Sequence, residues 1–227
     1  MKANETIDSF LSDKLQIIQS RQGYRFSVDA LLLAEFVSIR SNDVVVDLGA
    51  GCGIISLILA VKRKVGFIVG LELQEELASQ AQRNIALNKL VKKIGIIRGD
   101  LRHLPIGPEF AHVVVCNPPY RRQKSGRINP DFSKAIARHE LSTKLDDILT
   151  AGKALLKPGG RLSLIYPANR LTEIFAKMRI QGVEPKRLQI VFPNSYSNAK
   201  LVMIEGKLQG KSGLKILPPL FGQGGSQ

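Results

Sequence analysis

The sequence is poor in the residues that build metal centres and disulfide frameworks. It has two cysteines, three histidines and no tryptophan among 227 residues. Cys52 and Cys116 lie in apolar stretches far apart in the sequence, which favours reduced, structural thiols in a cytoplasmic protein. Because no histidines and cysteines stand at metal-ligand spacing, we expect no metal site.

Long apolar runs are missing too, and this bears on where the chain works. No run reaches the roughly 20 residues that a membrane-spanning helix needs. The opening MKANETIDSF lacks the apolar core of a signal peptide. We therefore expect a cytoplasmic protein that does not bind membranes, with a monomer as the default state. The apolar fraction of 44% is that of an ordinary globular protein.

Acidic residues are scarce relative to basic ones. The 33 Lys and Arg residues face 19 Asp and Glu residues, so the formal net charge is +14 at pH 7. Such a surplus favours a polyanionic partner, and nucleic acid fits better than a membrane surface. Residues 121–138 carry six basic residues against the single acid Asp131: Arg121, Arg122, Lys124, Arg127, Lys134 and Arg138. We interpret this segment as a phosphate-binding loop; the alternative is an ordinary solvated surface loop.

From Asp43 onward, short apolar runs alternate with helical patterns. Helices are expected at residues 53–62, 74–89, 143–156 and 169–181. Strands are expected at residues 43–49, 66–73, 94–100, 111–117, 161–167, 187–193 and 200–208. The alternation predicts an α/β, Rossmann-like fold: a seven-stranded, mostly parallel sheet with helices on both faces. The last two strands have no helix between them, which predicts an antiparallel hairpin at the C-terminal edge.

The chain divides into three parts by composition. Residues 1–40 read as an N-terminal helical extension packed on the main domain, with an apolar helix over Ser27–Val37 and Ser27 as its N-cap. Residues 41–210 hold the α/β domain. Residues 211–227 are expected to form a C-terminal tail that ends in the low-complexity GQGGSQ.

Four consecutive predicted strands end in residues suited to ligand binding. The first runs into a glycine-rich turn, DLGAGCG, at Asp47–Gly53; the second ends at Glu72, the third at Asp100 and the fourth at Asn117–Tyr120, Asn-Pro-Pro-Tyr. The carboxyl ends of parallel strands share the edge where open α/β sheets bind ligands. Each feature alone has a plain structural explanation, as a turn, a helix-start acid or a rigid strand end, but the joint pattern favours a binding site.

This combination resembles the class I S-adenosylmethionine-dependent methyltransferases over about residues 27–206. The resemblance implies S-adenosyl-L-methionine as the cofactor. Its methionine part would lie against Asp47, Gly49 and Gly51, its ribose against Glu72, and its adenine against Asp100 and Leu101.

Within that class, Asn-Pro-Pro-Tyr marks enzymes that methylate planar nitrogens: adenine N6, guanine N2 or a glutamine amide. The resemblance implies that the Asn117 side-chain oxygen and the Pro118 carbonyl accept the two amine hydrogens, with Asn117 also beside the cofactor. Tyr120 would stack on the base, which makes these three the expected catalytic residues. Such hydrogen bonds favour the nitrogen as it becomes positively charged in the transition state.

The N-terminal segment is similar to one family within this class. Gln19, Gly23, Tyr24, Phe26, Ser27, Asp29 and Ala30–Ala34 match a pattern of the bacterial tRNA adenine-N6 methyltransferases that modify A37 of a valine tRNA. The resemblance implies tRNA as the partner, gripped by Arg121, Arg122, Lys124 and Arg127. Ser27 and Asp29 could touch the amino-acid end of the cofactor, although an N-cap with a first-turn acid explains both.

Three other functions remain open. Release-factor glutamine methyltransferases share Asn-Pro-Pro-Tyr, but they usually carry a larger helical domain than the 40 residues available here. Methylation of guanine N2 in ribosomal RNA is a variant of the RNA methylation expected here. A catalytically silent RNA-binding module is the third, and the intact glycine loop and Asn-Pro-Pro-Tyr count against it.

Overall fold

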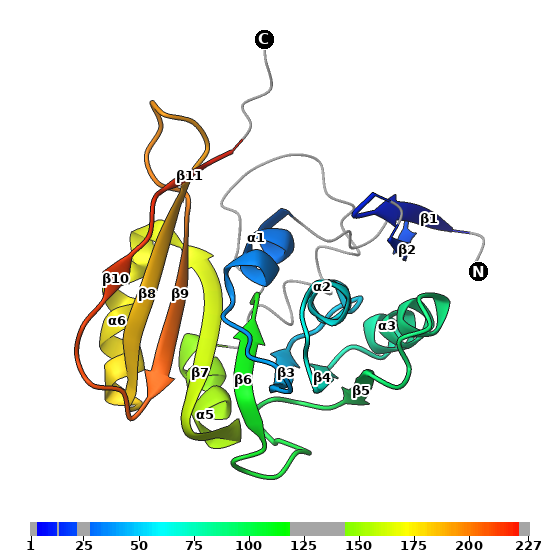
Figure 1. The fold of residues 1–227 in the computed structure, drawn as a ribbon, viewed down its shortest axis with the longest axis horizontal. Helices are drawn as coiled ribbons and strands as arrows, with labels where there is room; N and C mark the ends of the chain where they lie inside the picture. The colour runs from blue at the N-terminus through cyan, green and yellow to red at the C-terminus, as the bar shows by residue number, and fades with distance from the viewer. Residues whose placement is uncertain (1–3, 13, 22–27, 119–143, 223–227) are drawn as a thin grey trace.

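The computed structural model describes residues 4–12, 14–21, 28–118 and 144–222. A nine-stranded sheet runs through the molecule, with helices on both of its faces (Figure 1). From one edge to the other the main path of strands is β10-β8-β9-β7-β6-β3-β4-β5, and β11 also pairs with β8. In chain order the strands of this sheet are β3 (Val44–Leu48), β4 (Phe67–Glu72), β5 (Ile94–Arg98), β6 (Ala111–Cys116), β7 (Leu156–Pro167), β8 (Val183–Phe192), β9 (Leu201–Leu208), β10 (Lys215–Ile216) and β11 (Leu220–Phe221).

The predicted sheet class is confirmed, but its strand number is wrong. Strands β5, β4, β3, β6 and β7 are parallel, and β9 is antiparallel to both β7 and β8, which gives the expected edge hairpin. The sheet has nine strands rather than seven because the segment assigned to the tail pairs with β8. The N–H groups of Leu217 and Gly222 donate to the carbonyls of Leu188 and Phe192, both at 2.8 Å. An unpaired strand edge is satisfied in this way.

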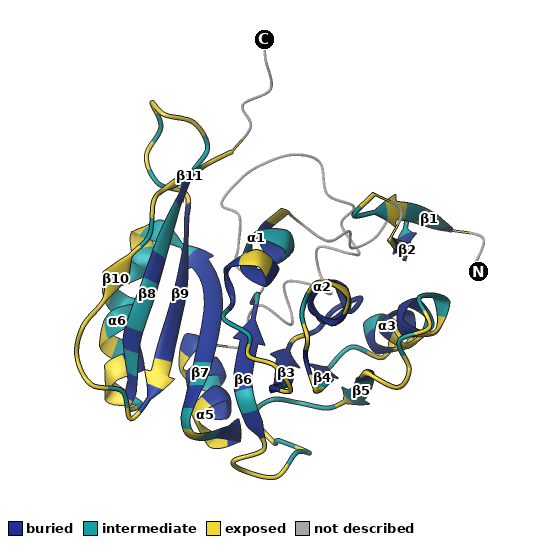
Figure 2. Cartoon of the chain, viewed as in Figure 1, coloured by how far each residue is buried: buried dark blue, intermediate teal, exposed yellow. Residues whose placement is uncertain are grey.

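The helices form two layers, one on each face of the sheet. Helices α1 (Val28–Phe36), α2 (Ile54–Lys62) and α3 (Glu75–Leu87) cover one face, and α5 (Leu145–Leu155) and α6 (Leu171–Ile180) cover the other. Successive residues of a strand point to opposite faces, so Val45 and Val113 enter one core and Val46 and Val114 the other. Figure 2 shows the central strands buried and the outer side of α6 exposed.

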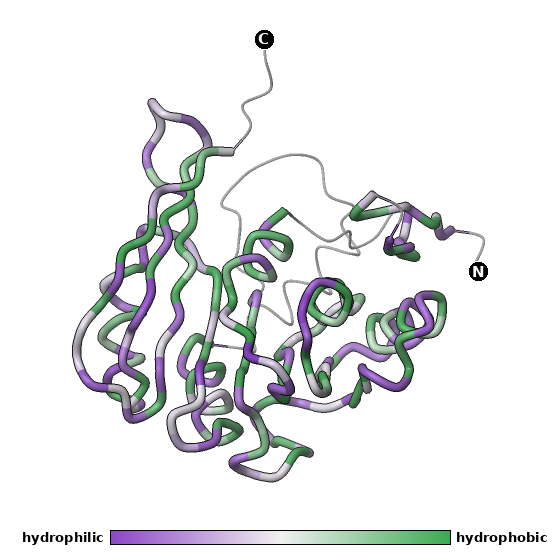
Figure 3. The backbone as a smooth tube through the Cα atoms, in the orientation of Figure 1, coloured by the Kyte–Doolittle hydropathy of each residue, from purple (hydrophilic) through white to green (hydrophobic). Residues whose placement is uncertain are grey.

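The edge of the sheet differs in pattern from its centre. Hydrophobic and hydrophilic residues alternate along β8 (Figure 3), whereas β3 is buried from Val45 to Leu48. A strand covered on both faces reads as a continuous apolar run, and an edge strand does not. No helix among the described residues is long and apolar enough to cross a membrane.

The first 40 residues are not only helical. Helix α1 lies where a helix was predicted, but a β-hairpin precedes it, formed by β1 (Glu5–Phe10) and β2 (Leu15–Ser20). Ser27, the predicted N-cap, lies outside the described residues. The division of the chain near residues 40 and 210 stays a prediction.

The hairpin is held by a row of amide side chains on α3. Gln80, Asn84 and Asn88 are four residues apart and therefore share one face of the helix. Asn84 accepts the Ile18 N–H at 2.7 Å, and Gln80 donates to the Ile18 carbonyl at 2.8 Å. Asn88 accepts the Gln16 N–H at 2.9 Å and donates to its carbonyl at 2.7 Å. These side chains replace the neighbouring strand that β2 lacks on this side.

Loss of Asn84 should therefore be costly. Its side chain is fully buried, and its amide also donates to the carbonyl of Cys52 at 3.0 Å. We expect Asn84→Ala to lower the free energy of unfolding by about 2–4 kcal/mol, because it leaves buried backbone groups without partners. Urea denaturation measures this loss. Gln82→Ala, a change at an exposed position of the same helix, should stay within about 0.5 kcal/mol of wild type. Equal losses of stability for both variants would contradict the role of the buried amides in holding the hairpin.

Candidate active site

The strand register brings the predicted site residues to one edge of the sheet. Leu48, the last residue of β3, pairs with Leu71 of β4 on one side and Cys116 of β6 on the other. Gly49 and Asn117 therefore follow neighbouring positions on adjacent parallel strands. Strand order reverses between β3 and β6, and α/β sheets bind ligands at such a switch point.

The glycine-rich turn has a backbone that other residues rarely adopt. Gly49, Gly51 and Gly53 have φ angles of 71°, 58° and 84°, which lie in the left-handed region. The N–H groups of Gly49 and Ala50 donate to the Leu71 carbonyl at 2.8 and 3.0 Å, so the turn is fastened to β4. A Cβ atom at Gly49 would meet no atom within 4 Å, so the space beside this residue is open among the described residues.

Glu72 fastens the same turn from its other side. This carboxylate is buried, and its two oxygens accept the Gly51 N–H at 2.8 Å and the Gln74 N–H at 2.9 Å. The Glu72 carbonyl accepts the Gly99 N–H at 3.0 Å. One residue thus joins the loops that follow β3, β4 and β5. The sequence located this acid at a strand end but gave no sign of its bonds to the neighbouring loops.

Asp47 is a buried carboxylate with one unsatisfied oxygen. One side-chain oxygen accepts the Ser56 hydroxyl at 2.8 Å; the other, Oδ1, is buried and has no hydrogen-bond partner among the described residues. Burial raises the pKa of this carboxyl to about 6, the bonds from Ser56 oppose the rise, and the charge of Glu72 adds to it. A buried acceptor without a partner marks a place where a ligand can donate.

The raised pKa of Asp47 predicts a specific pH dependence of stability. The pKa of this carboxyl is about 6 in the folded protein but 3.8 for the free side chain, so deprotonation favours unfolding. The protonated carboxyl contributes its full stabilisation below pH 3.8, and this contribution is lost as the pH rises through about 6. The free energy of unfolding changes by about 3 kcal/mol over this range.

We expect Asp47→Asn to lack this loss. Its free energy of unfolding relative to wild type, from urea denaturation, should therefore rise between pH 4 and pH 7. Glu109→Gln, at an exposed acid, is the control and should show no such rise. A difference in the free energy of unfolding between Asp47→Asn and wild type that does not change with pH would contradict the raised pKa of Asp47.

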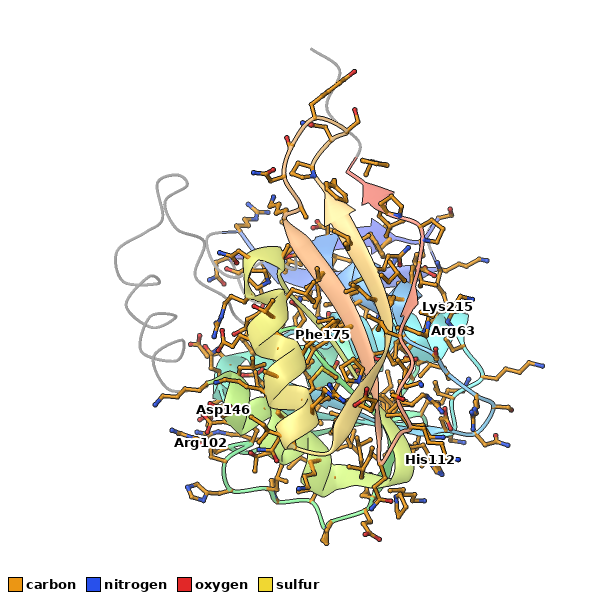
Figure 4. All side chains as sticks on the ribbon, turned by 90° about the vertical axis from the view of Figure 1, so that its left-hand side faces the viewer. Arg63, Arg102, His112, Asp146, Phe175 and Lys215 are labelled. Atoms are coloured by element: carbon orange, nitrogen blue, oxygen red, sulfur yellow. The ribbon has the colours of Figure 1, made fainter. Side chains whose placement is uncertain are left out.

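Asp100 and Leu101 follow β5 at the same edge, but Asp100 already has a strong partner. Its carboxylate accepts the backbone N–H of Arg102 at 2.9 Å and two guanidinium nitrogens at distances down to 2.6 Å. This pairing lowers the pKa of Asp100 to about 2. Arg102 lies on the outside of the molecule (Figure 4), and Leu101 packs half-buried against the core under α5. The sequence did not predict this ion pair.

The structure describes only the first half of Asn-Pro-Pro-Tyr. Asn117 is half-buried and Pro118 is buried. The other predicted catalytic and RNA-binding residues lie outside the described residues: Tyr120, Arg121, Arg122, Lys124 and Arg127.

Burial raises the pKa of the Cys116 thiol, next to Asn117, far above its usual range and that of Cys52 to about 12, so both thiols are protonated and inert.

Tyr166 and His112 lie at opposite ends of the central strands. Tyr166, near the end of β7, is buried; the Arg170 guanidinium lies 4.9 Å from its ring centroid and donates to its hydroxyl at 2.7 Å. Sequence reasoning missed this residue because a single tyrosine at a strand end carries no motif. His112 (labelled in Figure 4) lies at the start of β6, whereas Asn117 follows its end, and its ring accepts the Val44 N–H at 3.0 Å. Its contacts are structural.

Metal ligands do not gather at this edge within the part of the chain that the structure describes. No group of three or more His, Cys, Asp or Glu side chains there could hold a metal ion.

Comparison with known proteins identifies the family. The model of the methyltransferase small domain matches residues 27–181, more than half of the chain. The chain belongs to this methyltransferase family. The match spans the glycine turn, Glu72 and Asn117.

Two curated relatives carry the same name, "tRNA1(Val) (adenine(37)-N6)-methyltransferase". The protein from Shewanella halifaxensis is 33% identical over 156 residues, which is 67% of this chain and 62% of that protein. The chain thus spans less than two thirds of that relative's length. The protein from Parabacteroides distasonis is 26% identical over 197 residues and covers 86% of this chain and 82% of its own length.

A solved structure of similar fold comes from Agrobacterium tumefaciens and is described as a predicted O-methyltransferase. It superposes with a TM-score of 0.67 at 22% identity and covers 85% of this chain and 86% of its own. At this identity the likeness establishes the fold alone.

Proposed function

We propose that the protein transfers a methyl group from S-adenosyl-L-methionine to the exocyclic N6 of adenine in tRNA, at position 37 of a valine tRNA. The observation that carries the proposal is the register of β3 with β6, which sets Asn117–Pro118 beside the open glycine turn. The names of the two relatives support adenine in tRNA as the acceptor. The cytoplasm, where tRNA is modified, is the expected location.

The residues present fit the cofactor. The unsatisfied Oδ1 of Asp47 suits a cationic donor such as the cofactor's amino group, and the space beside Gly49 admits the chain of its methionine. Glu72 would hold the ribose hydroxyls through its carboxylate. Asp100 and Leu101 would flank the adenine, with Arg102 sharing the Asp100 carboxylate. When bound, the cofactor supplies a methyl group already activated by its sulfonium, so no metal is required.

The acceptor end of the site depends on Asn117 and Pro118. An adenine amine is a poor nucleophile because its lone pair is delocalised into the ring. We propose that the Asn117 oxygen and the Pro118 carbonyl accept the two amine hydrogens and so orient the lone pair toward the methyl group. These bonds strengthen as the nitrogen becomes positive, and proximity supplies much of the remaining acceleration. Pro118 also restricts the backbone of Asn117, which keeps the acceptors rigid.

The remaining part of the proposal concerns RNA contact. Tyr120 would stack on the target base, and phosphates would be gripped by Arg121, Arg122, Lys124 and Arg127. A base held in a stack must first be extruded into the pocket. The net charge of +14 suits a polyanionic substrate.

Replacing Asn117 should separate catalysis from cofactor binding. We expect Asn117→Ala to lower kcat at least about 100-fold, because a hydrogen bond made mainly in the transition state is lost. The Kd for S-adenosylhomocysteine should stay within a few-fold of wild type. Asn117→Asp keeps an acceptor oxygen and should retain more activity than Asn117→Ala. Near-normal turnover by Asn117→Ala would contradict the proposed role.

One assay tests the acceptor. Labelled S-adenosylmethionine is incubated with the protein and either total tRNA, ribosomal RNA or purified release factor, and the labelled product is identified by mass analysis. The proposal expects N6-methyladenosine in tRNA. Label only in release factor would establish the glutamine reaction, label in ribosomal guanine the N2 reaction, and no label with any acceptor a silent module.

A further inference from the structure

The loop between β8 and β9, residues 193–200, lies at the same edge of the sheet as the proposed site. Strand β8 runs in the same direction as β7, because both are antiparallel to β9. Pro167 of β7 and Val191 of β8 both pair with Leu201, so the two strands end at the same level. Figure 1 shows the loop projecting beyond these strand ends, at the top of the view. It therefore flanks the acceptor end of the site.

An aromatic side chain stands at the tip of this loop. Tyr196 is 98% exposed, more than any other large hydrophobic residue among those described. Of the three exposed aromatic side chains there, Tyr196 and Phe221 belong to this corner, and Phe221 lies 5.7 Å from Phe192 between ring centroids. An exposed ring of this size gains free energy only when a partner covers it.

Hydrogen bonds hold the backbone of the loop on both sides of Tyr196. The Asn194 side chain accepts the Tyr196 N–H at 3.0 Å, which is a local turn. At the far end of the loop, the Lys200 N–H donates to the Val191 carbonyl at 2.9 Å, and its carbonyl accepts the Ala168 N–H at 3.0 Å. The loop is thus tied to β8 and to the turn after β7, next to the buried Tyr166.

The charge around the loop suits a polyanion. The loop itself, residues 193–200, carries one basic residue, Lys200, and no acid. Glu205 is buried and paired with Arg187 at 3.1 Å, so it does not offset this charge at the surface. Lys200 is exposed and makes no ion pair with the described residues. An exposed aromatic ring beside an unopposed lysine is a combination that binds single-stranded nucleic acid.

The distance to the acceptor site matches a few nucleotides. Strands β7 and β9 lie between β6 and β8, and neighbouring strands are about 4.8 Å apart, so β6 and β8 are about 15 Å apart across the sheet. Strand β8 also ends about 10 Å further along the strand direction, because Cys116 pairs with Leu164 whereas Val191 lies level with Pro167. Successive nucleotides of one strand rise about 3.4 Å. The two strand ends are therefore about 18 Å apart, and a base on Tyr196 would stand at least about five stacked nucleotides from the base at Asn117.

We propose that the 193–200 loop is a second RNA-contact element, in which Tyr196 stacks on an unpaired base near the target nucleotide and Lys200 binds a phosphate of the same strand. This inference rests on the proposed function, since it places the second contact on the RNA that carries the methylated base. The loop selects RNA that offers an unpaired base at this spacing. Neither the family match nor the glycine turn includes this loop, because the match ends at residue 181.

The test compares full-length variants for tRNA binding and methylation. Tyr196→Ala should raise the Kd for unmodified tRNA about tenfold, because stacking on one base is lost, and should raise KM rather than lower kcat. Tyr196→Phe keeps the ring and should bind as wild type does. Lys200→Ala should lower the salt slope of log Kd by about one phosphate contact. Ile180→Ala, which removes another exposed apolar side chain (79% exposed) at the end of α6, is the control.

The outcomes separate this inference from the proposed function. If wild type methylates tRNA and Tyr196→Ala binds tRNA as tightly as wild type, the inference is overturned and the proposed function stands. If wild type methylates only protein, the proposed function fails, and a Tyr196→Ala defect confined to that protein acceptor overturns the RNA contact as well. A tenfold loss of tRNA affinity in Tyr196→Ala but not in Tyr196→Phe or Ile180→Ala supports the inference.

Discussion

The bonds of the Glu72 carboxylate are the interaction on which the geometry of the site depends. Left-handed glycines allow the turn after β3 but do not hold it in place, because glycine is equally free to leave that conformation. Glu72 supplies the restraint by accepting N–H groups from Gly51 and Gln74 with its two oxygens. These bonds to a buried charge are stronger than bonds to a neutral acceptor. They fix the turn beside β6, and so fix the position of any ligand on the turn relative to Asn117.

The proposed site divides into a half for the methyl donor and a half for the acceptor. Strands β3, β4 and β5 end in the donor half, where buried or paired carboxylates lie close to backbone N–H groups. Strands β6, β7 and β8 end in the acceptor half, where Asn117, the buried Tyr166 and the exposed Tyr196 succeed one another across the sheet. The hairpin β1–β2 closes the donor half, because Asn84 bonds both Ile18 and the Cys52 carbonyl within the glycine turn. In the proposed function, the charge of the RNA would be met by lysines and arginines outside this carboxylate-rich centre.

Sequence reasoning predicted the elements that carry a strong periodic signal. All seven main strands, helices α2, α3, α5 and α6, and the strand-end positions of Asp47, Glu72, Asp100 and Asn117 follow from apolar runs and glycine turns. The hairpin β1–β2 was missed because its stability comes from amides on α3, sixty and more residues away. Strands β10 and β11 have two residues each, too few for any pattern. The pairing of Asp100 with Arg102 and the unsatisfied oxygen of Asp47 depend on side-chain geometry that no spacing reveals. The row Gln80, Asn84, Asn88 was a signal that could have been used, since buried amides at helical spacing need partners.

The central claim is that the glycine turn, held by Glu72, is the seat of the methyl donor. The most direct test is titration calorimetry of S-adenosylhomocysteine into wild type, Glu72→Gln and Glu76→Gln, an exposed acid in the first turn of α3. Glu72→Gln loses a charge-assisted acceptor, and its amide N–H opposes a backbone N–H, so the account predicts affinity weakened about tenfold or more. Glu76→Gln should match wild type. Equal affinity in all three proteins, or no binding heat in wild type, would contradict the account.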